Sequence, residues 1–109
     1  MDELTAERLA RNQAMFREAN QRIVAAAAEI GLKEPTVPFI CECSDPMCTQ
    51  VLTVDLADYE SIRRNSRRFL HAPGHDDGLG EVVELHDSYV VVEKTGLAGA
   101  IAEETDPRS

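Results

Sequence analysis

The chain has 109 residues, of which 43% are hydrophobic, 28% are charged and 5% are aromatic, and its formal net charge is −9. This length suits a single domain, which we place at residues 1–104, followed by a flexible tail at residues 105–109. A negative field repels phosphate backbones and anionic lipids, so the charge argues against nucleic-acid and membrane-surface partners.

Two features of the chain bear on its location. It opens with acidic residues where a secretory signal carries basic ones. Its longest apolar run, residues 23–28, is far shorter than the roughly 20 residues of a membrane span. We therefore expect a cytoplasmic protein without a membrane segment, in a compartment that keeps thiols reduced.

Strong helix formers fill residues 4–30, and apolar residues recur there every seven positions, at Leu9, Phe16, Ile23 and Ile30, with Ala19 and Ala26 between them. This spacing predicts one long helix with a narrow apolar seam, ended by Gly31. The seam either covers the core of this domain or meets a protein partner or a second copy of the chain. We favour the core, because so short a chain has few other apolar faces to cover a sheet.

Two short strands are predicted on either side of a turn. Residues 39–43 are extended and follow a connector that contains Pro35 and Pro38, and residues 51–54 form the second strand. The Ser-Asp-Pro composition of residues 44–46 is typical of a turn. This turn swings the chain back on itself.

A second helix is predicted over residues 56–65, with Asp55 capping its first turn and Tyr59 and Ile62 facing inward. Four arginines gather at its end: Arg63, Arg64, Arg67 and Arg68. We interpret them as a solvated helix end favoured by the helix dipole, in preference to an anion site, because acidic residues lie just upstream.

A hairpin is predicted over residues 81–94. With residues 87–88 as its turn, the expected pairs are Leu85 with Val90, Val83 with Val92, and Glu81 with Lys94. A three-residue loop is the alternative, and it would shift this register. Residues 69–72 predict a further strand, and residues 97–104 a short helix. Together the elements predict an α+β fold, with a long N-terminal helix packed on a small antiparallel sheet.

Three cysteines, Cys41, Cys43 and Cys48, lie within one short segment. Thiolates are preferred zinc ligands, and residues two apart on an extended chain project to one face, where the following turn can bring the third sulfur. We therefore predict one structural Zn²⁺ ion, with iron as the alternative metal. Buried free thiols, or a redox pair with a third resolving cysteine, are the other interpretations.

The fourth ligand must come from another segment, and the candidates are His71, His75, His86, an aspartate or water. We choose His75, because it follows Pro73 and Gly74 in a tight turn that can present an imidazole. His71 falls on a predicted strand, and His86 falls at the predicted hairpin turn.

Four protein ligands fill the coordination of zinc and leave no position for a reactive water. We therefore expect a non-enzymatic, zinc-stabilised interaction or regulatory domain. A small zinc hydrolase is the alternative if the fourth ligand is water, with a base among Asp45, Asp76, Asp77 and Glu42. A thiol-based redox or zinc sensor is a third possibility.

The chain also resembles a group of small uncharacterised bacterial proteins, mostly actinobacterial. The similar segments are residues 11–13, 39–43, 48–49, 72–75, 89–94 and 103–107. The resemblance implies that Cys41, Cys43, Cys48 and His75 belong to one motif, Cys-x-Cys-x4-Cys followed by Pro-Gly-His. It implies no activity.

Overall fold

The computed structural model describes residues 2–31, 36–75 and 78–108. In chain order the elements are α1 (Glu3–Glu29), β1 (Thr36–Ile40), β2 (Val51–Asp55), α2 (Leu56–Arg63), β3 (Arg68–His71), β4 (Gly80–Leu85), β5 (Val90–Lys94) and α3 (Gly96–Glu104). The strands form two antiparallel sheets, β1-β2 and β3-β5-β4. The predicted α+β class is confirmed, with two small sheets in place of one.

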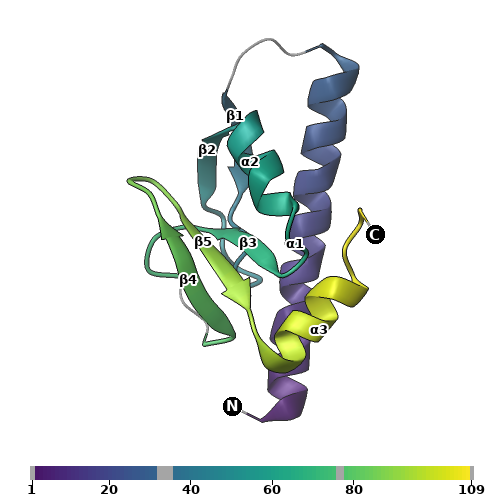
Figure 1. Ribbon diagram of the computed structural model, residues 1–109, viewed down its shortest axis with the longest axis vertical. Coiled ribbons are helices and arrows are strands. Elements are labelled where there is room, and N and C mark those ends of the chain that lie inside the picture. Colours follow the sequence, from purple (N-terminus) through teal and green to yellow (C-terminus); the bar gives the residue numbers. More distant parts are fainter. Residues whose placement is uncertain (1, 32–35, 76–77, 109) are drawn as a thin grey trace.

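Helix α1 spans almost the whole length of the molecule beside both sheets (Figure 1). Its 27 residues correspond to about 40 Å of helix, and the longest dimension of the molecule is 44 Å. Asp2 caps its start by accepting a hydrogen bond from Thr5 N at 2.8 Å. Gly31, with φ of 66°, follows its end. The predicted long helix and its stop are confirmed. Among the described residues no helix is long and apolar enough to cross a membrane.

The buried face of α1 differs from the predicted seam. Its buried residues are Ala10, Gln13, Arg17, Asn20 and Ala27. Four of them lie one position after Leu9, Phe16, Ala19 and Ala26 of the predicted seam. Leu9 and Ile23 pack at the edge of the core, whereas Ile30 is 74% exposed. The predicted period was right and the phase was wrong, because the structure buries polar side chains that find hydrogen-bond partners.

The main core lies between the sheets, α2 and the middle of α1. Its centre is a stacked pair of rings, Phe39 and Tyr59, 4.2 Å apart. Tyr59 and Ile62 face inward as predicted, with 0% and 3% exposure. Asp55 occupies the N-cap position of α2, but its side chain makes no capping hydrogen bond, so that prediction was wrong.

Strand β1 begins earlier than predicted. Pro38 lies within it, opposite Thr53, instead of in a connector, which a two-stranded sheet tolerates because each strand is an edge. Pro35 falls outside the described residues. Beyond β1 the chain continues towards both sheets: Cys41 N donates to Gln50 O at 3.0 Å, and Glu42 N donates to Leu70 O at 2.7 Å.

The β4-β5 hairpin confirms the predicted register only near its turn. Leu85 pairs with Val90, and His86 N donates to Tyr89 O at 3.0 Å. A β-bulge at Val83 then shifts the pairing, so that Val92 pairs with Val82 and Lys94 with Gly80. The predicted pairs Val83–Val92 and Glu81–Lys94 were therefore wrong.

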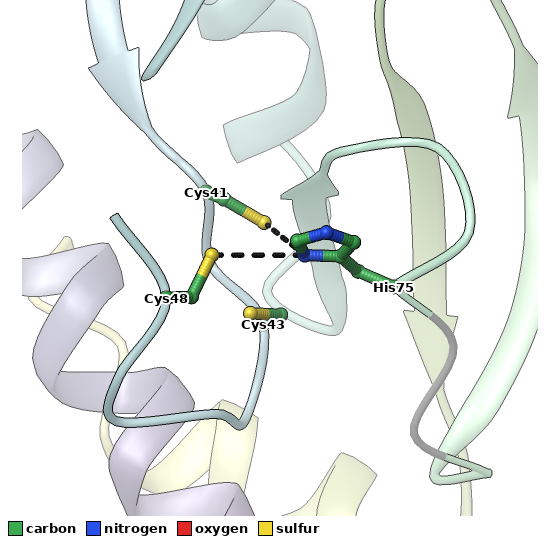
Figure 2. A group of neighbouring side chains, drawn as sticks. All are labelled: Cys41, Cys43, Cys48 and His75. Atoms are coloured by element: carbon green, nitrogen blue, oxygen red, sulfur yellow. Dashed lines mark hydrogen bonds between the residues drawn. The ribbon is translucent and has the colours of Figure 1, made fainter. Parts of the chain in front are cut away.

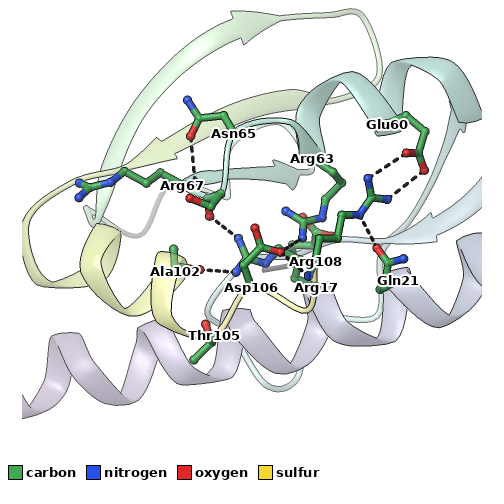
Figure 3. A network of polar contacts seen from close by, with 12 residues as sticks. Arg17, Gln21, Glu60, Arg63, Asn65, Arg67, Ala102, Thr105, Asp106 and Arg108 are labelled. Atoms are coloured by element: carbon green, nitrogen blue, oxygen red, sulfur yellow. Dashed lines mark hydrogen bonds and ion pairs between the residues drawn. The ribbon is translucent and has the colours of Figure 1, made fainter.

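Of the four arginines at the end of α2 only Arg64 is exposed, so the predicted solvated helix end is wrong for the other three. Arg63 is 3% exposed and pairs with Asp106 (Figure 3). Arg67 pairs with Glu103, and Arg68 pairs with Glu93. Arg17 of α1 lies beside them and donates to Ser66 O at 2.5 Å and to Ala102 O at 2.6 Å. We refer to Arg17, Arg63 and Asp106 as the buried arginine cluster.

The residues after α3 contact the rest of the molecule. Besides the Asp106 pair, Arg108 meets Glu60 with two bonds, at 2.8 and 2.9 Å, and Gln21 at 2.7 Å. The expected mobility of residues 105–109 stays a prediction.

Candidate metal centre

Cys41 and Cys43 lie directly after β1, where the chain is still extended, and both are buried, at 2% and 3% exposure. Residues two apart on such a chain project to the same side. Cys41 is fixed further by Ala72, whose backbone N–H donates to Cys41 Sγ at 3.1 Å. Two thiols therefore reach one point from a single short segment.

Cys48 returns to the same point through a turn. Cys48 N donates to Asp45 O at 3.1 Å, and Met47 N donates to the side-chain Oδ1 of Asp45 at 2.9 Å. An aspartate whose side chain accepts a bond from two residues on is a common turn device. The predicted return of the chain at residues 44–46 is confirmed.

His75 comes from a second tight turn, between β3 and β4. His75 N donates to Ala72 O at 3.2 Å, and Gly74 has φ of 82°. Proline at the second position and a glycine with positive φ at the third define a type II turn. This turn presents the imidazole to the three sulfurs (Figure 2).

The four donor atoms form one compact group. The ligand atoms of Cys41, Cys43, Cys48 and His75 all lie within 4.8 Å of one another. His75 Nδ1 is 3.5 Å from Cys41 Sγ and 3.6 Å from Cys48 Sγ. A zinc tetrahedron with Zn–S of about 2.3 Å and Zn–N of about 2.0–2.1 Å has S···N edges of about 3.6 Å. The spacing of the donors thus suits a metal ion at their centre.

Burial opposes free thiolates at this place. It raises the pKa of the Cys41 thiol to about 12, despite the hydrogen bond from Ala72 N–H, and it also raises the pKa of the Cys43 thiol. A bound cation reverses this preference, because a coordinated thiol loses its proton to the metal's field. Buried sulfurs gathered this closely therefore gain from a cation among them.

The other two histidines do not join the group. His71 is fully buried, with Nδ1 3.0 Å from His75 O and Nε2 3.2 Å from Lys94 Nζ. A carbonyl only accepts, so Nδ1 carries a proton, and both ring nitrogens are engaged. His86 stacks on Tyr89 and contacts Glu84 at the hairpin end.

Of the acids proposed as bases for a hydrolase, the two that lie in the described residues, Glu42 and Asp45, do not join the group. Glu42 lies between two of the cysteines but is fully buried, and both its carboxylate oxygens accept hydrogen bonds. Asp45 accepts from Met47 N in the turn. Asp76 and Asp77 fall outside the described residues.

Asn20 and Glu42 support the metal centre from close by, and the sequence did not predict this role for them. Asn20, from α1, bonds Ile40 and Glu42, and Glu42 bonds Asn20 and Tyr59. A signal was present in each case, because an asparagine within an apolar helix pattern and a single acid within an apolar segment both indicate a buried polar partner.

No family model, no curated protein and no solved structure matches the chain. The candidate site therefore rests on its own geometry.

Proposed function

We propose that this protein is a small zinc-stabilised interaction or regulatory domain, with one Zn²⁺ held by Cys41, Cys43, Cys48 and His75. The observation that carries the proposal is the arrangement of three sulfurs and one imidazole nitrogen within 4.8 Å, with S···N separations of 3.5 and 3.6 Å. Soft sulfur and imidazole ligands in this number favour zinc over magnesium or calcium.

The role of the metal is structural in this proposal. A site with four protein ligands has no open position for a substrate or an activated water. The ion links the segment after β1 to the turn after β3, and so closes a long loop between Cys48 and His75. Such closure restricts the unfolded chain more than a local turn does. The engaged carboxylate of Glu42 also argues against the alternative of a hydrolase.

The solvent-facing side of α1 is the surface that we propose for a protein partner. Leu4, Met15 and Ile30 of this helix are 80%, 68% and 74% exposed. Sedimentation velocity of wild type and of Met15→Glu tests the case in which the partner is a second copy. A dimer that the substitution dissociates would support it, and a monomer at all concentrations would leave a different protein as the partner.

Metal analysis of the purified protein tests the zinc site. We expect one zinc per chain, lost in His75→Ala and retained in His86→Ala, which removes an imidazole outside the donor group. Thermal melts with and without a chelator should show a large fall in melting temperature for wild type and none for His75→Ala. Iron in place of zinc would correct the identity of the metal. Metal-free wild type of unchanged stability would refute the proposal.

A further inference from the structure

The segment 40–44 has two faces. Its side chains alternate between them, as in any extended chain. Cys41 and Cys43 point to the metal centre, while the residues between and beside them meet α1. Asn12 Nδ2 donates to Ser44 O at 3.4 Å. Asn20 makes two bonds to the backbone of Ile40, at 2.8 and 2.9 Å. One helix therefore contacts this segment at residues 40, 42 and 44, which alternate with the ligands.

Glu42 is the centre of these contacts. Its side chain is 0% exposed, and it accepts hydrogen bonds from Asn20 Nδ2 at 2.8 Å, Tyr59 OH at 2.5 Å and Leu70 N at 2.8 Å. Burial, followed by the neighbouring Glu42 carboxylate, raises the pKa of Tyr59, so its hydroxyl stays a donor. The three donors come from α1, α2 and β3. A buried carboxylate with this many partners has little freedom to move.

We propose that Asn20 and Glu42 are positioning residues of the metal centre, through which α1 sets its affinity for the metal. The inference rests on the zinc site proposed above. A tetrahedral site tolerates ligand displacements of only about 0.5 Å. Glu42 lies between two ligands in the chain, so a shift of its backbone moves both sulfurs. Because Ile40 and Glu42 are held against α1, the sulfurs of Cys41 and Cys43 stay close to the donor atoms of Cys48 and His75.

The coupling acts in both directions. If docking of α1 strengthens metal binding, metal binding strengthens docking of α1 by the same factor. The middle of the buried face of α1 is polar, with Gln13, Arg17 and Asn20 all at most 1% exposed. Its docking therefore depends on specific hydrogen bonds as well as on apolar contact. A partner that draws α1 away from the segment 40–44 would lower the affinity of the site.

The test compares two substitutions that each remove a buried contact of α1. Asn20→Ala removes the bonds to Ile40 and Glu42. Ile101→Ala removes a side chain from the apolar cluster of α1 and α3 but leaves the segment 40–44 untouched. We expect Asn20→Ala to weaken zinc affinity at least tenfold in competition with a colorimetric chelator, and Ile101→Ala to change it less than twofold. The d–d bands of bound Co²⁺ should shift only in Asn20→Ala.

A second variant keeps the test decisive if Asn20→Ala does not fold. Glu42→Gln preserves the size of the side chain but sets an amide donor against either Asn20 Nδ2 or Leu70 N. We expect it to lower zinc affinity in the same way. Unchanged affinity in both variants, or an equal loss in Ile101→Ala, would overturn the inference. If wild type binds zinc and the variants bind it equally well, only the positioning role is refuted. If wild type binds no zinc, the metal site itself is refuted.

Discussion

The metal centre and the buried arginine cluster join distant parts of the chain in different ways. At the metal centre, donors from one extended segment and two tight turns meet at one point, and residues 41–48 supply three of the four. In the cluster, Arg17, Arg63 and Asp106 come from three separate regions, and no local pattern connects them. Both regions bury ionisable groups.

The two regions also differ in how completely their polar groups are paired. The four donors of the metal centre suit one shared cation. In the cluster two buried guanidinium groups face one carboxylate, and among the described side chains Nε of Arg17 and Nε and Nη1 of Arg63 have no hydrogen-bond partner. Burial and the nearby Arg63 charge lower the pKa of Arg17 to about 10. We therefore expect the metal centre to contribute more to stability.

The largest effect should follow loss of one thiolate. Cys43→Ser removes a ligand, and metal binding in small zinc domains contributes about 10–16 kcal/mol of apparent binding free energy. We expect the free energy of unfolding to fall by at least ~3 kcal/mol in denaturant titrations. A chelator should destabilise wild type to the same level and leave Cys43→Ser unchanged. Equal stability of wild type and Cys43→Ser in zinc would contradict the structural role.

A smaller loss is expected in the buried arginine cluster. Arg63→Ala leaves Asp106 without its guanidinium partner, and breaking a buried pair in this way costs about 3 kcal/mol. Arg64→Ala is the matched control, because Arg64 is exposed one position along the chain. Denaturant titrations in the presence of zinc compare the two variants. If Arg63→Ala loses no more stability than Arg64→Ala, the Arg63–Asp106 pair makes no net contribution to stability.

The pH dependence of stability gives a third test. Burial alone would raise the pKa of Asp106, but hydrogen bonds from Arg108 N–H and from Arg63 outweigh it and hold the pKa below the usual 3.8. The carboxylate therefore stabilises the fold fully above about pH 4 and loses this contribution as the pH falls through its lowered pKa. Asp106→Asn should be less stable than wild type at pH 7, and the difference should shrink below pH 4. A constant difference would exclude this linkage.

The sequence predicted the parts of the fold that depend on neighbouring residues. The heptad spacing indicated the period of α1 but assigned its buried face to Phe16 and Ala19 instead of Arg17 and Asn20. The prediction took the position of the buried face from hydrophobicity alone. That rule fails where polar side chains are buried with hydrogen-bond partners. In the same way the hairpin register held at Leu85, beside the turn, and failed beyond the bulge at Val83.

The candidate site was predictable for the same reason. The end of a strand, an Asx turn and a Pro-Gly turn each depend on a few neighbouring residues. These three features carry all four donor atoms. The support from Asn20 and Glu42 was not predicted, because it depends on how α1 lies against the segment 40–44. The partner of Arg63 lies 43 residues away along the chain, and nothing in the local composition points to it.

The smallest effect is expected at the surface of the same region. Arg108 contacts Glu60 and Gln21 where all three side chains reach solvent, and such a pair contributes less than about 1 kcal/mol because water and salt screen it. Arg108→Ala should therefore lower the free energy of unfolding by a few tenths of a kcal/mol, and less in high salt. Arg22→Ala, which breaks the more exposed pair with Glu18, is the matched control. Hydrogen exchange at the backbone amides of residues 105, 106 and 108 in Arg108→Ala would then test what protects the tail from exchange. Unchanged protection would assign it to Asp106 and Arg63, whereas faster exchange would mean that the surface pair holds the tail against α2.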